Sequence, residues 1–129
     1  MKLILDDMKN RNEVLELSIE FAISVISFAE LLEKNRKFVI ANQLLKAGTS
    51  IGANIHEAQS AESKADFIHK LKIADKEANE TEYWLILCEK ADSYPYDPNI
   101  MTALISIKKL LSKIISSSKR NQQINKSTN

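Results

Sequence analysis

The chain is poor in residues that form covalent or metal cross-links and in residues that interrupt regular structure. Cys88 is its one cysteine, so no intramolecular disulfide can form, and with only two histidines it belongs to no CxxC or Cys/His metal pattern. Only two glycines and two prolines occur among 129 residues, of which 44% are apolar. This composition predicts one compact domain with a substantial core, in which Cys88 is a small packing residue.

Long apolar runs are also missing. No stretch approaches the roughly eighteen consecutive apolar residues of a membrane span. The apolar run within Met1 to Asp7 is too short, and too soon followed by acids, for a secretory signal. We therefore expect a cytoplasmic protein that has no membrane partner.

Apolar residues recur every three or four positions over residues 10–33 and again over residues 37–59, which predicts an amphipathic helix in each range. The second range carries both glycines, Gly48 and Gly52, and a glycine inside a helix costs about 1 kcal/mol relative to alanine. Their spacing of four places them on one helix face, which predicts a close approach of a neighbouring backbone. A loop around Gly-Thr-Ser-Ile-Gly is the alternative. A phosphate-binding loop is disfavoured, because neither a Lys-Ser/Thr ending nor a preceding strand pattern is present.

The third predicted helix, residues 63–92, has the clearest periodicity in the chain. Ser63 and Asp66 have the spacing of a capping pair at a helix start. A heptad seam with alternating steps of four and three follows: Phe67, Leu71, Ala74, Ala78, Thr81, Leu85 and Cys88. Asp97 is a plausible N-cap and Pro98 suits the first turn of a fourth helix over residues 98–117.

Four helices with short connections predict an all-α fold, an antiparallel up-down-up-down four-helix bundle over residues 1–118. Residues 119–129 are too poor in apolar groups to compensate for the entropy lost on ordering. We therefore expect a disordered basic and polar tail.

A set of half-polar positions lies beside these seams, and a simple bundle does not need it. Its members are Lys70, Glu77, Glu80 and Trp84 on the third helix and Ser50, Asn54 and Glu57 on the second. A tryptophan among hydrogen-bonding groups is typical of protein interfaces, so we interpret these residues as a polar network at a subunit contact. The alternative is that Trp84 is core and the carboxylates face solvent. Buried carboxylates would need hydrogen bonds from Ser50, Asn54 or Lys70, within one chain or across subunits.

Three segments carry a family resemblance. They are residues 43–59, Gln-Leu-Leu-Lys-Ala-Gly-Thr-Ser-Ile-Gly-Ala-Asn-Ile-His-Glu-Ala-Gln; residues 63–67, Ser-Lys-Ala-Asp-Phe; and residues 77–85, Glu-Ala-Asn-Glu-Thr-Glu-Tyr-Trp-Leu. The chain resembles, over roughly residues 10–115, the four-helix-bundle proteins encoded in intervening sequences of bacterial 23S rRNA genes. For that family no common biochemical activity is established.

The resemblance implies a small bundle that assembles into a ring-like homopentamer. It also implies a relation to the accessory protein of diversity-generating retroelements, which contacts a reverse transcriptase and nucleic acid. For the second helix, it favours continuity through both glycines.

Charge is distributed unevenly, because every acid lies at or before Asp97. The part that follows carries six cations, Lys108, Lys109, Lys113, Lys119, Arg120 and Lys126, which against a net charge of +1 leaves −5 for residues 1–97. Repeated around a ring, this basic end predicts binding of RNA or a nucleoprotein, with Lys108, Lys109, Lys113, Lys119 and Arg120 as candidate contacts. Two alternatives stay open: a protein-docking scaffold or accessory subunit, and a solvated helix end whose charge complements the helix dipole.

No catalytic pattern is recognisable. A di-metal bundle site needs carboxylates from four helices and two Glu-x-x-His pairs, whereas no acid follows Asp97 and Glu-x-x-His does not occur. Cys88 lies on an apolar seam, and neither His56 nor His69 has a recognisable nucleophile partner. We predict a non-catalytic protein without a metal, a cofactor or a small-molecule substrate.

Overall fold

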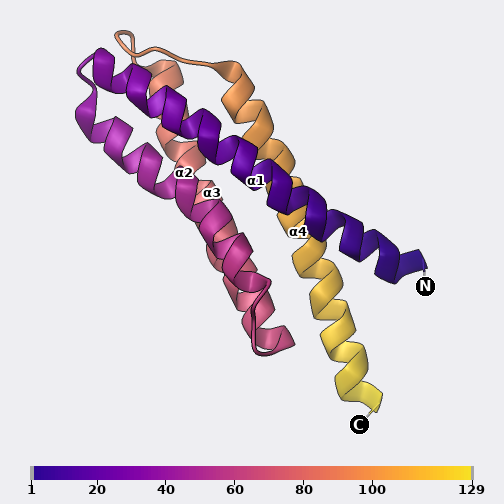
Figure 1. Ribbon diagram of the computed structural model, residues 1–129. Helices are drawn as coiled ribbons and strands as arrows, with labels where there is room; N and C mark the ends of the chain where they lie inside the picture. Colours follow the sequence, from indigo (N-terminus) through magenta and orange to yellow (C-terminus); the bar gives the residue numbers. More distant parts are fainter. Residues whose placement is uncertain (1, 129) are drawn as a thin grey trace.

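The computed structural model describes the backbone of residues 2–128 and the side chains of residue 2 and residues 5–124. It contains four helices: α1 (Lys2–Lys34), α2 (Phe38–Ala58), α3 (Lys64–Lys90) and α4 (Pro98–Thr128). No strand occurs in the described part of the chain. The chain turns back at each connection, so that both termini lie toward one end of the molecule (Figure 1). This arrangement is an all-α, four-helix fold.

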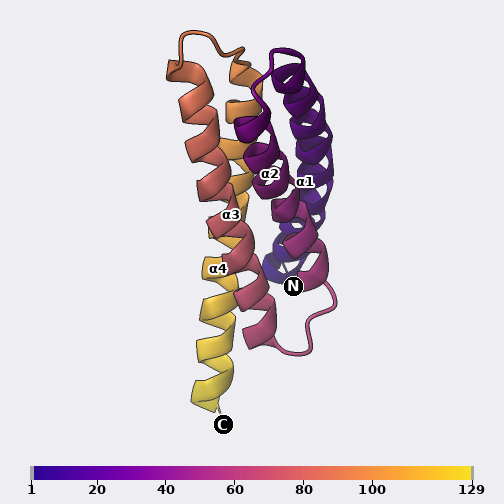
Figure 2. The same cartoon turned by 90° about the vertical axis from the view of Figure 1, so that its left-hand side faces the viewer.

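Each helix packs against two others, which leaves one core between all four. Helix α1 contacts α2 and α4, and α3 likewise contacts α2 and α4. At one end of the molecule, Lys37 Nζ donates to Ser93 Oγ at 3.0 Å and so joins two connections. At the other, Ser117 Oγ donates to Asp7 Oδ1 at 2.9 Å and joins α4 to α1. Figure 2 shows α1 beside α2 and α3 beside α4.

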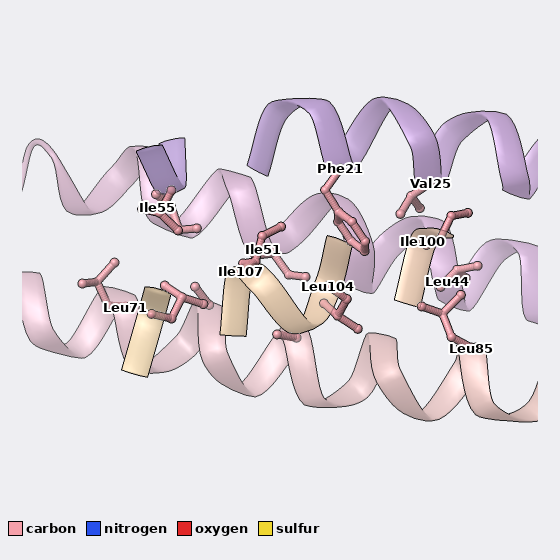
Figure 3. Close-up of a cluster of buried hydrophobic side chains, with 14 of the residues drawn as sticks. Phe21, Val25, Leu44, Ile51, Ile55, Leu71, Leu85, Ile100, Leu104 and Ile107 are labelled. Atoms are coloured by element: carbon pink, nitrogen blue, oxygen red, sulfur yellow. The ribbon is translucent and has the colours of Figure 1, made fainter. Parts of the chain in front are cut away.

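The core consists of the apolar stripes of the four helices. Phe21, Leu44, Leu85 and Leu104, one from each helix, are at most 2% exposed and converge in the interior (Figure 3). All seven residues of the predicted α3 seam are buried, which confirms that prediction. Burial raises the pKa of the Cys88 thiol to about 11, so this cysteine stays protonated at neutral pH.

Helix α2 is continuous through both glycines, so the loop alternative is wrong. A Cβ added at Gly48 would lie 2.8 Å from Val25 Cγ1, and one added at Gly52 would lie 3.2 Å from Ser18 Oγ. Both contacts are with α1. The glycines therefore let α1 and α2 approach more closely than any residue with a side chain would allow at Gly48.

Polar side chains cap α3 and α4 as predicted. Ser63 Oγ accepts the Asp66 backbone N–H at 3.0 Å, and Asp66 Oδ2 accepts the Glu62 N–H at 3.3 Å. Asp97 Oδ1 accepts the Asn99 N–H at 3.0 Å, and Pro98 is the first residue of α4. These bonds satisfy donors that a helix start leaves free.

The ends of α1 and α4 differ from the prediction. Helix α1 begins at Lys2 rather than near residue 10, and α4 continues to Thr128, where a disordered tail was expected after residue 118. Near these ends the two helices are joined through Asp7, which accepts the Ser117 hydroxyl, and Asn10 and Ser118 are buried. These polar positions lie just before the stretch in which the tail was expected, and an apolar pattern does not reveal them. Within residues 2–128, no helix combines the length and hydropathy that crossing a bilayer requires.

Candidate nucleic-acid interface

Three of the predicted cations share one exposed stripe of α4. Lys109, Lys113 and Arg120 follow one another at steps of four and seven, which places them on one side of a helix. The opposite side of α4 is buried through Leu104, Ile107, Leu111, Ile114 and Ser118. None of the three cations forms an ion pair with a described side chain. Together they present three free positive charges along about three turns.

Lys108 does not belong to this set. It lies at the side of α4 that faces α3, where its ammonium pairs with the Glu82 carboxylate. The two side chains are 28% and 33% exposed. The charge of Lys108 is therefore largely neutralised within the chain, and its sequence position gave no indication of this partner.

Lys119 instead lies beside a cation that was not among the predicted contacts. The close approach of the Lys72 side chain and its positive charge lower the pKa of Lys119. Lys72 is an exposed residue of α3. Lys72 precedes Glu82 by ten residues and Lys119 follows Lys108 by eleven, so the two contacts are about equally far apart along α3 and along α4. Two neighbouring ammonium groups extend the positive surface from α4 onto α3.

The polar face of α2 and α3 contains one of the hydrogen bonds that were expected. Lys70 Nζ lies 3.2 Å from Glu57 Oε2, with side chains 32% and 60% exposed. Ser50 and Asn54 do not reach a carboxylate. Ser50 Oγ donates to the Lys46 carbonyl at 2.7 Å, and Asn54 Nδ2 donates to the Ser50 carbonyl at 2.9 Å, both within α2.

Glu77 and Glu80 lie together on α3. Partial burial raises the pKa of the Glu77 carboxyl, and the negative charge and hydrogen bonding of Glu80 raise it further. Lys46 and Lys76 act in the opposite direction. In the single chain Glu80 is exposed and Glu77 half-buried, so no fully buried carboxylate network exists on this face.

Trp84 has features both of a core residue and of an interface residue, the two interpretations of its sequence position. It is half-buried and packs against the core, while its ring meets that of exposed Tyr83 edge to face, with centroids 5.1 Å apart. Its Nε1 is buried and has no hydrogen-bond partner in the described part of the chain. The indole is thus a half-buried residue that packs against the core with a buried, unsatisfied N–H, and the exposed part of this aromatic pair is Tyr83.

The described residues contain no group of three His, Cys, Asp or Glu side chains arranged to hold a metal ion. His56 and His69 are both exposed, and no shared cluster includes them. The chemistry that the described surface offers is therefore positive charge on α3 and α4 and mixed polar and aromatic groups on α2 and α3.

These features first define a class: an all-α four-helix protein with a glycine contact between α1 and α2 and an exposed, acid-free α4. The family model described as "23S rRNA-intervening sequence protein" matches residues 10–117. The chain belongs to this family, as its resemblance indicated. The matched range begins and ends within α1 and α4, so the first turns of α1 and the last of α4, with Lys119 and Arg120, lie outside it.

A solved structure agrees with this assignment. It is a protein of unknown function of the S23 ribosomal protein family from Bacteroides thetaiotaomicron, 45% identical to this chain. The similarity covers 83% of this chain and 98% of that chain, with a TM-score of 0.79. No curated protein matches the chain significantly.

Proposed function

We propose that this protein is a non-catalytic cytoplasmic RNA-binding protein, and that antiparallel four-helix bundles assemble into a ring-like homopentamer. The RNA surface consists of Lys109, Lys113 and Arg120 on α4 with Lys119 and Lys72 at the edge toward α3. A nucleoprotein would be bound through the phosphates of its RNA.

The free stripe on α4 carries this proposal. Residues 98–129 contain no Asp or Glu, and Lys109, Lys113 and Arg120 are exposed without an ion-pair partner among the described side chains. A phosphate that binds there therefore does not have to displace a carboxylate from these cations. The lowered pKa of Lys119 supports the same role, since a phosphate between two ammonium groups would relieve their repulsion.

A ring strengthens such a weak site. One bundle offers only a few phosphate contacts, but copies arranged around an axis bind one RNA with an effective concentration set by their spacing. Counterion release then makes the affinity strongly dependent on salt. In this proposal the polar face of α2 and α3 supplies the contact between neighbouring subunits, where Glu57, Glu77 and Trp84 would find further partners.

A protein-docking scaffold is the second candidate, and Trp84 favours it. Exposed Tyr83 and the half-buried Trp84 ring that it meets edge to face form an aromatic edge, and aromatic residues of this kind are enriched among interface anchors. Binding at such a surface would survive moderate salt, because apolar contacts are screened less than phosphate contacts.

The test is fluorescence anisotropy of a labelled structured RNA, titrated across salt, with the oligomer mass measured by light scattering in the same samples. The test variant is K109Q/K113Q/R120Q. Its matched control is K34Q/R36Q/K90Q, which also removes two lysines and one arginine, from exposed positions at the other end of the bundle.

We expect the test variant to bind about tenfold or more weakly at low salt, while the control stays within about twofold of the wild type. The slope of log affinity against log salt should become shallower by about 0.7–0.9 for each phosphate that the variant no longer neutralises, the lower value applying to single-stranded segments. Equal reductions in the two variants, or no binding by an intact wild-type oligomer at low salt, would overturn the RNA proposal. Salt-resistant capture of a protein would then support the docking scaffold.

A further inference from the structure

Helix α1 has a second apolar seam on the side that faces away from the core. It repeats at steps of three and four through Leu5, Met8, Asn12, Leu15, Ile19, Ala22 and Ile26. The large apolar members Leu5, Met8, Ile19 and Ile26, with neighbouring Ile23, are between 43% and 59% exposed. A heptad seam of this kind packs against another helix, and no helix of the described chain covers it, since α1 contacts only α2 and α4.

The surface at this seam is hollowed. Leu5, Met8, Lys9, Asn12, Glu13 and Glu16 line a depression of about 600 Å³ near the start of α1. It has apolar walls from Leu5 and Met8 and opposite charges at its edges, from Lys9 on one turn and Glu16 two turns later. Such a site fits a helix that inserts an apolar side chain and carries one positive and one negative charge beside it.

We propose that a second copy of this chain occupies this face, with the outer seams of the two α1 helices packed antiparallel around a two-fold axis. Alternate layers of an antiparallel heptad pair place Met8 against Ile19 of the second copy and Leu5 against Ala22. Asn12 then lies close to the axis, where a polar residue in an apolar seam sets the register.

The charges fit this register. Lys9 follows Met8, and Glu16 follows Leu15, so the two occupy equivalent flanking positions one heptad repeat apart. In the antiparallel pair, Lys9 lies beside Glu16 of the second copy, and the two-fold axis produces the same ion pair again. Glu20 stays on the outer side of the pair, and Glu13, one heptad repeat earlier, lines the depression one turn after Lys9.

A parallel pair fits less well. In a parallel pair, the flanking residues that meet across the two helices are five positions apart, so Arg11 would have to lie beside Glu16 of the second copy. Arg11 is engaged in its own bundle, where its guanidinium carbon lies 4.2 Å from the centre of the Phe67 ring. The antiparallel arrangement leaves that contact intact.

This pairing goes beyond the proposed ring, because it uses a different face. A two-fold contact through α1 would join two rings, or two single bundles if no ring forms. The seam spans three heptads, a length of about 30 Å, and the bundle already holds α1 helical, so little further ordering is needed on binding. Leu5, Met8 and Lys9 precede the range matched by the family model, so the pairing is a property of this chain.

The experiment compares the oligomer masses of K9E, E16K and the double variant K9E/E16K by light scattering at micromolar concentration. Each single change places two like charges together, and we expect it to halve the wild-type mass. The double change exchanges the members of both ion pairs, and we expect it to restore the mass. The control set K90E, D92K and K90E/D92K makes the same charge changes at exposed positions remote from the seam and should leave the mass unaltered.

A second variant tests the apolar contact. Ile19→Ser should also halve the mass, whereas Val39→Ser, at an α2 residue that is 74% exposed, should not. Far-UV circular dichroism must show unchanged helix content in every variant that is compared.

The outcomes separate this pairing from the proposed function. Single variants with wild-type mass, or a double variant no heavier than the singles, overturn the pairing and leave RNA binding and the ring intact. A wild type that is a monomer overturns the pairing and the ring together. Halved masses with RNA binding retained per subunit support the pairing.

Discussion

The contact between α1 and α2 and the contact between α3 and α4 differ in what holds them together. Where α1 meets α2, the Gly48 backbone lies directly against the Val25 side chain and the Gly52 backbone against Ser18, so α2 contributes no side chain to these two contacts. Where α3 meets α4, long charged side chains span the outer edge: Glu82 pairs with Lys108, and Lys72 lies beside Lys119. The contact between α1 and α2 has no space for an added atom at Gly48. The contact between charged side chains of α3 and α4 depends on salt and pH.

The difference separates stability from binding within one small domain. Close packing of apolar atoms contributes stability that depends on shape and is insensitive to charge. Exposed ion pairs contribute little stability, because water and salt screen them, whereas the cations Lys72 and Lys119, which have no ion-pair partner among the described side chains, remain available to a partner. Changes at the α1–α2 contact should therefore alter folding, and changes at the α3–α4 edge should alter binding more than folding.

The largest effect is expected for Gly48→Ala. The new Cβ would lie 2.8 Å from Val25 Cγ1 and 2.9 Å from Cγ2, and a β-branched valine in a helix has little freedom to move away. Overpacking costs about 1–3 kcal/mol, and the better helix propensity of alanine returns up to about 1 kcal/mol. We expect a net decrease of about 1–2 kcal/mol in the free energy of unfolding, measured by urea titration.

Two further variants sharpen that measurement. In a Val25→Ala background Gly48→Ala should no longer destabilise, because the clashing methyl groups are gone; an unchanged penalty would contradict the close contact. Gly52→Ala should cost less than Gly48→Ala, since its nearest neighbours are Ser18 Oγ at 3.2 Å and Ser18 Cβ at 3.4 Å.

A smaller effect is expected for Glu82→Gln at the α3–α4 edge. The ion pair with Lys108 is about one-third exposed, and such pairs contribute about 0–1 kcal/mol. Urea unfolding at low and high salt should show a destabilisation that shrinks as salt rises. Lys109→Gln is the control, because Lys109 has no ion-pair partner among the described side chains. Equal, salt-independent destabilisation in the two variants would show that the ion pair does not act on stability.

The smallest effect concerns pH and Glu77. Its pKa is raised above the ordinary value of 4.5, chiefly by burial and also by Glu80, so the folded protein holds this proton more tightly than the unfolded chain does. Stability from that proton is present below pH 4.5 and is lost as pH rises through the folded pKa. Glu77→Gln does not titrate and should melt at a slightly higher Tm than the wild type at pH 7.

Melting curves at pH 4 and pH 7 check this expectation. The difference between Glu77→Gln and the wild type should be smaller at pH 4, where the wild-type carboxyl is also protonated. A Tm difference of the same size at both pH values would show that altered packing or hydrogen bonding, and not charge, causes the effect.

The predictions from sequence succeeded where one helix contained the whole pattern. The α3 seam from Phe67 to Cys88 and the Ser63 cap depend on spacing along a single helix, so both were predictable. They failed for residues 119–128, which continue α4 although their composition is polar. The contact that precedes this stretch, between Ser117 and Asp7, joins positions 110 residues apart. Composition alone does not contain those partners.

The candidate site divides in the same way. Lys109, Lys113 and Arg120 share a stripe by spacing, and the acid-free composition after Asp97 makes that stripe positive. Their sequence neighbour Lys108 is paired with Glu82, and Lys119 lies beside Lys72, because α3 and α4 pack in one particular register. Within the single chain, Ser50 and Asn54 donate to carbonyls of their own helix, a choice that spacing alone did not reveal.

The sequence by itself determined four helices, the residues of their inner stripes, the position of both glycines on one face and the sign of charge on α4, because each depends on periodicity or composition within a short segment. The tertiary structure alone decided which charges are free, which are paired and which apolar seam remains uncovered. Those properties depend on distances between helices, and such distances are set only when the side chains of all four pack into a common core.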